Sequence, residues 1–210
     1  MIRIHKGKEP HTWFLYRTTT ANAEYKRIPE LVMALLREQG YICAYCTRRI
    51  PTKSKEDQNT NSKIDHIRSQ ADNAGLQLSY DNMAICCPGY LDRKEHCDTL
   101  KKKQNLTFDL YSDTLQNGIT YGSKDGKLES SNAGWQKEIE TVLNLNHPRL
   151  SSNRAGRLSG LKRVLKKGKW NKSSLTKKLG TWTDFDAAGK KKEYCGIVIW
   201  YLKRKLSRMT

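Results

Sequence analysis

The sequence predicts an α+β protein with a small mixed core, surrounding helices and a basic C-terminal extension. Three observations predict this class. Cysteines bracket two short apolar segments near the middle of the chain. Apolar residues recur at helical spacing on both sides of these segments, over residues 26–39, 135–146 and 154–167. Lysine and arginine then dominate the last third of the sequence.

The first predicted helix covers residues 26–39, KRIPELVMALLREQ, and ends at Gly40. It leads the chain directly to Cys43, so residues 1–40 form an N-terminal segment and helix. Residues 1–25 show no clear period, and residues 51–63 are polar and predict a loop.

Two short strands and a helix follow. The sequences KIDHIRS and MAICC predict the strands, and HCDTLKKKQ at 96–104 predicts the start of a helix with Asp98 near its N-terminus. We expect these elements to form a core over residues 41–106. An Asp-Gly hairpin in ITYGSKDGKLES and the helix at 135–146 complete the domain over residues 107–150. Residues 151–210 form the basic lobe.

The charge is concentrated in that lobe. The 210 residues include 39 Lys and Arg against 21 Asp and Glu, a formal net charge of +18 with a pI near 9.7. Residues 149–210 alone carry 18 basic and 3 acidic residues. This excess predicts a polyanionic partner, with nucleic acid favoured over a solvated face or an acidic protein. Tryptophans interleave with the charges, and we expect each of them in the core: Trp170, Trp182 and Trp200.

Membrane association is not expected. The longest apolar run, residues 194–202, is far shorter than the roughly 20 residues of a membrane-spanning helix. The N-terminus lacks the apolar region of a signal peptide. We therefore expect a cytoplasmic protein whose cysteines are thiols or thiolates.

Cys43 and Cys46 are separated by two residues, which suits either a redox dithiol or half of a zinc site. The redox interpretation is disfavoured because a helix precedes the pair and a polar loop follows it. A tetrahedral zinc site needs two more thiolates, and Cys97 supplies one of them. Adjacent strand residues face opposite ways, so only one of Cys86 and Cys87 can supply the other. Cys86 is favoured, Cys87 is the alternative, and Cys195 is expected in the core.

Between the cysteine pairs, and directly after Cys97, lie residue types that metal-assisted phosphodiester hydrolysis requires. Asp65 and Asp98 can bind Mg²⁺ or Mn²⁺ through oxygen. An imidazole that stays off the metal, that of His66, can deprotonate the attacking water. Hydrolysis of this kind leaves a 5′ phosphate and a 3′ hydroxyl. His96 adjoins Cys97 and is an alternative metal ligand or phosphate contact.

At these residues the chain resembles the HNH endonuclease family. The likeness lies in an ordered pattern: Cys43-x-x-Cys46, Asp65-His66-Ile67, Asp81-Asn82-Met83, Cys86 and Cys97-Asp98-x-x-Lys101. The resemblance implies a ββα-metal (HNH) core of two strands and a helix around one Mg²⁺ or Mn²⁺ ion, beside a zinc site of four cysteines.

The resemblance also assigns roles. His66 is then the general base and Asp65 a metal ligand. Asp98 stands where the family usually has Asn or His as its second ligand. Asn82 holds the catalytic loop and orients the His66 ring, and Lys101 touches a phosphate. Nucleic-acid contacts are expected from four side chains: Lys63, Arg68, Lys101 and Lys102.

The likeness extends over residues 2–158 to the HNH subunits of Septu-type anti-phage systems, the PtuB family. It lies in six ordered segments: IHKGKEPHTWFLYR, YICAYCTRRI, DHIRS, YDNMAICC, HCDTLKK and LNLNHPRL. It implies a PtuA-like ATPase partner and, in some systems, a retron reverse transcriptase with its RNA and DNA. DNA is the favoured substrate, and an RNA such as tRNA is the alternative. The rival interpretations are a non-catalytic zinc-ribbon module that binds nucleic acid and an interaction subunit.

Overall fold

The computed structural model describes residues 1–52 and 61–209, so most of the predicted polar loop at 51–63 lies outside the described residues. Two helices open the chain, α1 (His11–Thr19) and α2 (Pro29–Glu38). Helix α2 confirms the prediction, and it buries Leu31, Val32, Leu35 and Leu36. Helix α1 was not expected. It buries only Trp13, so its sequence shows no repeat of apolar residues at helical spacing.

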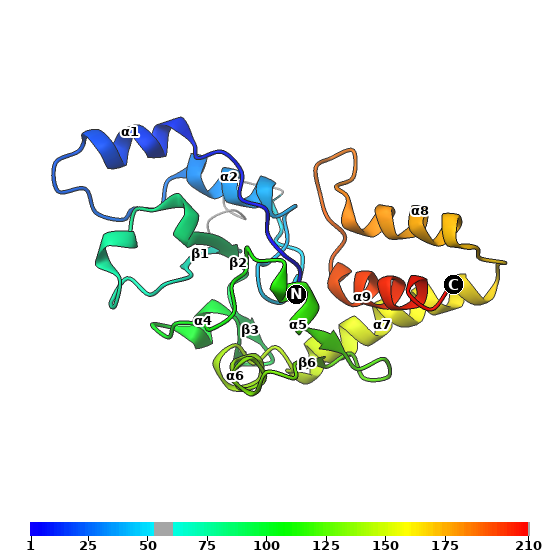
Figure 1. The fold of residues 1–210 in the computed structure, drawn as a ribbon. Coiled ribbons are helices and arrows are strands. Elements are labelled where there is room, and N and C mark those ends of the chain that lie inside the picture. The colour runs from blue at the N-terminus through cyan, green and yellow to red at the C-terminus, as the bar shows by residue number, and fades with distance from the viewer. Residues whose placement is uncertain (53–60, 210) are drawn as a thin grey trace.

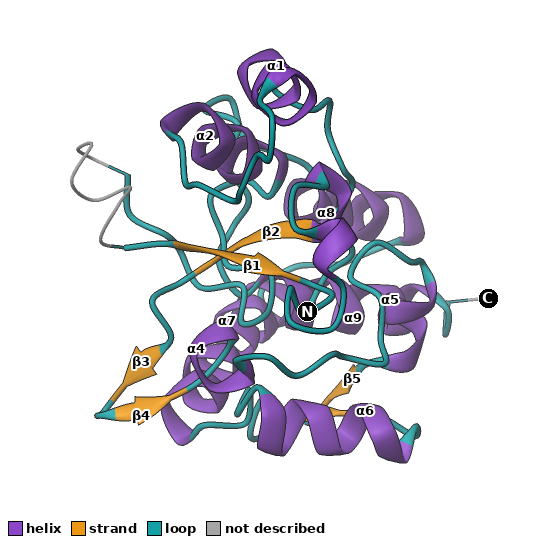
Figure 2. Ribbon diagram, turned by 90° about the vertical axis from the view of Figure 1, so that its left-hand side faces the viewer, coloured by secondary structure: helices purple, strands orange, loops and turns teal. Residues whose placement is uncertain are grey.

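An antiparallel pair of strands lies at the centre, β1 (Lys63–His66) and β2 (Met83–Cys86). Both strands were predicted. Lys63 pairs with Cys86 and His66 with Met83. Figure 2 shows this pair between α1 and α2 on one side and α4 (Asp98–Lys101) and α6 (Ala133–Lys137) on the other. The predicted helix at 96–104 is thus a single turn.

Two small ribbons flank this centre. The first pairs β3 (Tyr90–Leu91) with β4 (Lys94–Glu95) through Asp92 and Arg93, whose φ angles of 49° and 62° suit a tight two-residue turn. The second pairs β5 (Thr120–Tyr121) with β6 (Leu128–Glu129) and confirms the predicted hairpin. A short helix, α5 (Thr114–Gly118), precedes it, and a π-helical segment at Glu138–Val142 follows α6. Single 3-10 turns lie at Ala74–Leu76 and Tyr80–Asn82.

The C-terminal third is a helical lobe. It consists of α7 (Pro148–Lys166), α8 (Lys172–Thr183) and α9 (Cys195–Leu206), and α9 packs against the other two (Figure 1). Helix α7 begins six residues before the predicted start at residue 154. The apolar spacing over residues 154–167 predicts that Leu158, Leu161 and Val164 face inward. Leu158 and Leu161 are buried. Val164, expected on the same inward face, is 46% exposed.

The lobe and the rest of the chain share one hydrophobic core. Leu175, Ile197, Val198 and Leu202 are fully buried in the same cluster as the residues of α2 and β2. The tryptophans Trp170, Trp182 and Trp200 are partly buried against it. The mixed α and β composition with small antiparallel sheets agrees with the predicted class. Within the described residues, no helix has the length and apolarity that crossing a membrane would require.

Candidate functional site

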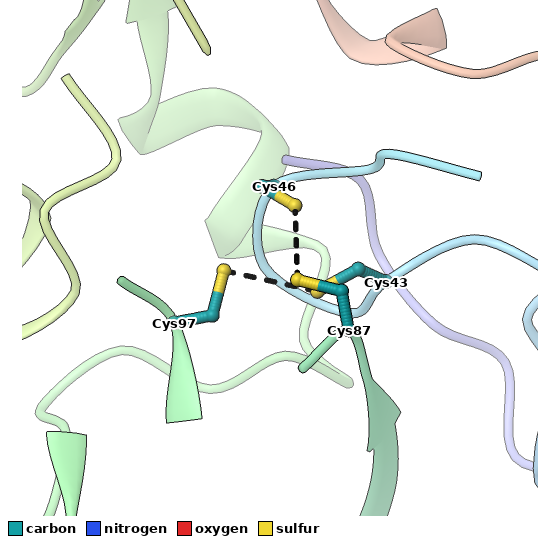
Figure 3. A group of neighbouring side chains, drawn as sticks. All are labelled: Cys43, Cys46, Cys87 and Cys97. Atoms are coloured by element: carbon teal, nitrogen blue, oxygen red, sulfur yellow. Dashed lines mark hydrogen bonds between the residues drawn. The ribbon is translucent and has the colours of Figure 1, made fainter. Parts of the chain in front are cut away.

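Four buried thiols form a candidate metal centre. The Sγ atoms of Cys43, Cys46, Cys87 and Cys97 all lie within 4.8 Å of one another (Figure 3). The Cys43–Cys97 and Cys46–Cys87 sulfur pairs are each 3.8 Å apart. A tetrahedral ion with Zn–S bonds of about 2.3 Å places its sulfurs about 3.8 Å apart. The cluster therefore could hold a metal ion such as zinc.

The backbone brings these thiols together from two turns. After α2, the Cys43 amide donates to the Arg48 carbonyl at 2.9 Å and the Thr47 amide to the Cys43 carbonyl at 3.0 Å. Cys87 directly follows β2, and the β3–β4 ribbon returns the chain to Cys97. The Cys97 amide then donates to the Leu143 carbonyl at 2.8 Å. Backbone hydrogen bonds within the protein therefore hold both cysteine-bearing segments in place.

The fourth thiol belongs to Cys87, which corrects the preference for Cys86. The physical reason is the alternation of an extended chain, in which neighbouring side chains face opposite ways. Cys86 is the last paired residue of β2, and Cys87 beyond it faces the Cys43 turn. Cys86 is fully buried and lies outside the four-thiol group, as a core thiol.

His96 lies outside the four-thiol group. Its Nδ1 is 3.0 Å from the Cys97 sulfur, and burial lowers the pKa of the ring to about 4. A neutral imidazole can donate from Nδ1 to a thiolate. His96 therefore supports Cys97 and does not replace it as a ligand.

A pocket of about 490 Å³ beside β1 and α4 holds the predicted catalytic side chains. Asp65 and His66 reach it from β1, and Asp98 reaches it from the first turn of α4. Lys102 lines the same pocket, as do residues that the sequence did not single out: Tyr25, Ile64, Ser69, Gln70, Ala71 and Lys103.

The His66 ring is held by contacts from two sides. Its Nε2 lies 2.9 Å from the Gln77 carbonyl and 3.1 Å from the Gln70 side-chain amide nitrogen. Because a carbonyl can only accept, the Gln77 contact favours the tautomer that carries the ring proton on Nε2. The Tyr25 ring meets the imidazole edge to face, with centres 4.7 Å apart. Within residues 1–52 and 61–209, Nδ1 forms no hydrogen bond. Because burial lowers the pKa of His66, the ring is neutral near pH 7 and Nδ1 can accept a proton.

Two carboxyl groups stand next to one another in this pocket. Burial raises the pKa of Asp98 to about 8, and the neighbouring Asp65 charge adds to the effect. Adjacent carboxylates of this kind share a proton or a cation. Two carboxylates also match the usual protein share of a Mg²⁺ shell, which keeps several waters. The donor set therefore fits a hard divalent ion.

Lys101 does not face the pocket, which corrects its predicted phosphate contact. Its ammonium is fully buried, 2.9 Å from Asp65 Oδ1 and 3.0 Å from the His66 carbonyl. The Tyr45 hydroxyl donates to the other Asp65 oxygen. The Lys101 side chain, at the end of α4, therefore points inward onto β1. Lys101 therefore orients Asp65, and a phosphate cannot reach it.

Asn82 holds the loop between the strands. Its Oδ1 accepts from the Arg68 amide at 2.8 Å, and its Nδ2 donates to the Arg68 carbonyl at 3.0 Å. Among the described residues it makes no hydrogen bond to the His66 ring, so its predicted orienting role is wrong. Gln77 has that role instead.

The other predicted nucleic-acid contacts differ in position. Lys102 is exposed at the pocket and Arg68 is exposed outside its lining, whereas the Lys63 ammonium donates to the Thr99 hydroxyl at 2.8 Å. Lys103 was missed, although the run of three lysines at 101–103 marks it. Tyr25 and Gln77 carry no local signal, because only the tertiary fold brings them to His66.

Comparison with known proteins adds no family to this description. No protein-family model matches the chain, and a search of the curated proteins finds no match.

Proposed function

We propose that the chain is a metal-dependent HNH endonuclease that hydrolyses nucleic-acid phosphodiester bonds. One observation supports this most: a neutral, oriented imidazole and two adjacent carboxyl groups share an open pocket with two exposed lysines. Metal-assisted phosphodiester hydrolysis requires these components. They come from one strand pair and from the helical turn beside it.

Each group has a distinct task in this proposal. Nδ1 of His66 takes the proton of the attacking water. The carboxylates of Asp65 and Asp98 hold Mg²⁺ or Mn²⁺, which supplies charge stabilisation for the leaving 3′ oxygen when bound. Lys102 and Lys103 attract and place the phosphate backbone.

The four-cysteine centre has a structural role in the same proposal. The turn at Cys43 lies against β2, because the Ala44 amide donates to the Ile85 carbonyl at 3.0 Å. Cys97 immediately precedes Asp98, so a zinc ion on Cys97 fixes the start of α4. A structural zinc then holds the second carboxylate in place opposite β1.

The partner proposal rests on the sequence resemblance alone. A PtuA-like ATPase, and in some systems a retron, would control the nuclease within a phage-defence complex. The test therefore uses the chain both alone and co-expressed with a neighbouring ATPase.

The experiment compares wild type with His66→Ala on plasmid DNA and on total cellular RNA, with Mg²⁺, Mn²⁺ or a chelator. We expect cleavage that needs the added ion, leaves 5′ phosphates and disappears in His66→Ala. The substrate that is cut decides between DNA and RNA. If His66→Ala cleaves as fast as wild type, the proposed site is wrong. A zinc-containing chain that binds both polymers and cuts neither would instead be the non-catalytic module.

A further inference from the structure

A second pocket lies in the basic lobe, built from different residues. It has a volume of about 590 Å³, within the range of small-molecule sites. Helix α7 contributes Lys162 and Leu165, and α9 contributes Trp200, Tyr201, Arg204 and Lys205. The α7–α8 turn, the β5–β6 turn and the segment after α9 complete its lining with Gly168, Trp170, Ser123, Arg208 and Met209.

The charge of this pocket is of one sign. Lys162, Arg204, Lys205 and Arg208 line it, and none of the described residues in the lining is acidic. Within the described part of the chain, none of these four cations forms an ion pair. The Lys162 ammonium donates to the Ser123 carbonyl at 2.8 Å, which fixes it at the rim. Unpaired cations at one pocket favour an anionic ligand.

Aromatic rings form the rest of the wall. Trp200 and Tyr201 are half-buried neighbours with ring centres 6.5 Å apart. The Arg204 guanidinium lies 5.5 Å from the Trp200 ring centre, and the Lys162 ammonium lies 5.4 Å from that of Tyr201. Cations and aromatic faces alternate here, as they do in sites that bind both the base and the phosphate of a nucleotide.

Trp170 supplies an unused donor. Its indole nitrogen is buried and has no hydrogen-bond partner among the described residues. The ring can lie against the chain because Gly168 has no side chain, and a Cβ there would lie 3.0 Å from the indole nitrogen. A buried indole N–H without an acceptor is costly, and a ligand that carries an acceptor would satisfy it.

We infer that this pocket binds a nucleotide unit, with the phosphate on Arg204 and Lys205 and the base against the aromatic wall. The unit is either a free nucleotide or one nucleotide of a single strand, since both present the same base and phosphate. Arginine suits the phosphate because its planar group can donate two hydrogen bonds at once. The pocket shares no lining residue with the His66 pocket. It is therefore a second site and does not depend on cleavage.

The test uses the full chain carrying His66→Ala, so that no strand is cut. The probes are adenosine monophosphate, a deoxyadenosine strand of about ten nucleotides and inorganic phosphate. Binding is followed by titration and by the indole N–H resonance of Trp170 in a nitrogen-15 spectrum, assigned with Trp170→Phe. The pocket variant is Arg204→Gln with Lys205→Gln. The matched control is Arg163→Gln with Lys177→Gln, which removes the same charge from exposed positions outside the pocket.

We expect the pocket variant to lose about tenfold or more in affinity, while the control stays within about twofold. The Trp170 resonance should shift with the bound probe. Saturation by adenosine monophosphate would identify a free nucleotide, and a response to the strand alone would identify a strand site. Equal losses in both variants with an unmoved Trp170 resonance would overturn the inference, as would inorganic phosphate binding as tightly as the nucleotide. Thermal melting of each variant shows whether the lobe is folded.

Discussion

Cys86 and Cys87 are sequence neighbours with opposite surroundings, and this difference can be tested. We expect Cys87→Ser to lose bound zinc, since it removes one of four ligands, while Cys86→Ser keeps it. The measurement is zinc per chain by elemental analysis after gel filtration. Each variant is the matched control of the other.

Zinc loss in Cys86→Ser with full zinc in Cys87→Ser would reverse the ligand assignment. Sequence alone limited the choice to one of the two residues, because the pleat allows only one to face the metal. It could not select the residue, since the last paired position of β2 depends on the pairing with Lys63.

Lys101 and Lys102 are a second pair of neighbours with different roles. Lys101→Met leaves the buried Asp65 carboxylate without its cation, so the free energy of unfolding should fall by about 3–5 kcal/mol. Lys102→Met changes an exposed side chain and should alter stability by less than about 0.5 kcal/mol while weakening nucleic-acid binding. Urea denaturation measures the first effect and a binding titration the second. Equal free energies of unfolding for the two variants would show that the Asp65–Lys101 ion pair does not stabilise the fold.

At the scale of elements, Arg154 joins α7 to the β5–β6 hairpin. Its guanidinium is buried and donates to the Gly126 carbonyl at 2.6 Å and the Leu145 carbonyl at 2.8 Å. Arg154→Leu should cost about 2 kcal/mol or more, because both carbonyls lose a charged donor. Arg157→Leu, one turn away, breaks only a partly exposed pair with Glu193 and should cost less than about 1 kcal/mol.

Thermal melts of the two variants make this comparison. A smaller loss in Arg154→Leu than in Arg157→Leu would mean that α7 does not need the hairpin.

The predictable elements are those with a strong local pattern. Helix α2 and most of α7 follow from their apolar spacing, and β1 and β2 from their short apolar runs between turns. Helix α1 was not predicted because Trp13 is its one buried residue, and the Trp13 indole donates to the Leu78 carbonyl at 3.0 Å. The inward direction of the Lys101 side chain was not predicted, because it depends on contacts with Asp65 and the His66 carbonyl, which are distant in the sequence.

At the scale of the molecule, the basic lobe is part of the folded unit. The Tyr194 amide donates to the Thr47 carbonyl at 2.9 Å, and the Lys191 amide donates to the Gly40 carbonyl at 3.0 Å. The lobe therefore holds the turn that carries Cys43 and Cys46. The sequence predicted its charge, and its packing depends on contacts between distant segments.

Deleting residues 160–210 should consequently unfold the chain, not simply weaken nucleic-acid binding. The deletion removes α8 and α9 and exposes apolar residues that α9 now covers. Far-UV circular dichroism and a melt would show the loss of a cooperative transition. A deleted chain that melts cooperatively and keeps its zinc would show that the lobe is an independent appendage.

The most direct test of the nuclease proposal is the single-turnover cleavage rate of His66→Ala against that of His11→Ala, a control at an exposed histidine of α1. Both proteins are prepared with the proposed ATPase partner, at equal zinc content and with the same melting temperature. We predict a loss of about hundredfold or more in His66→Ala and a change within about twofold in His11→Ala. Equal rates in the two variants would contradict the assignment of His66 as the general base, and with it the proposed active site.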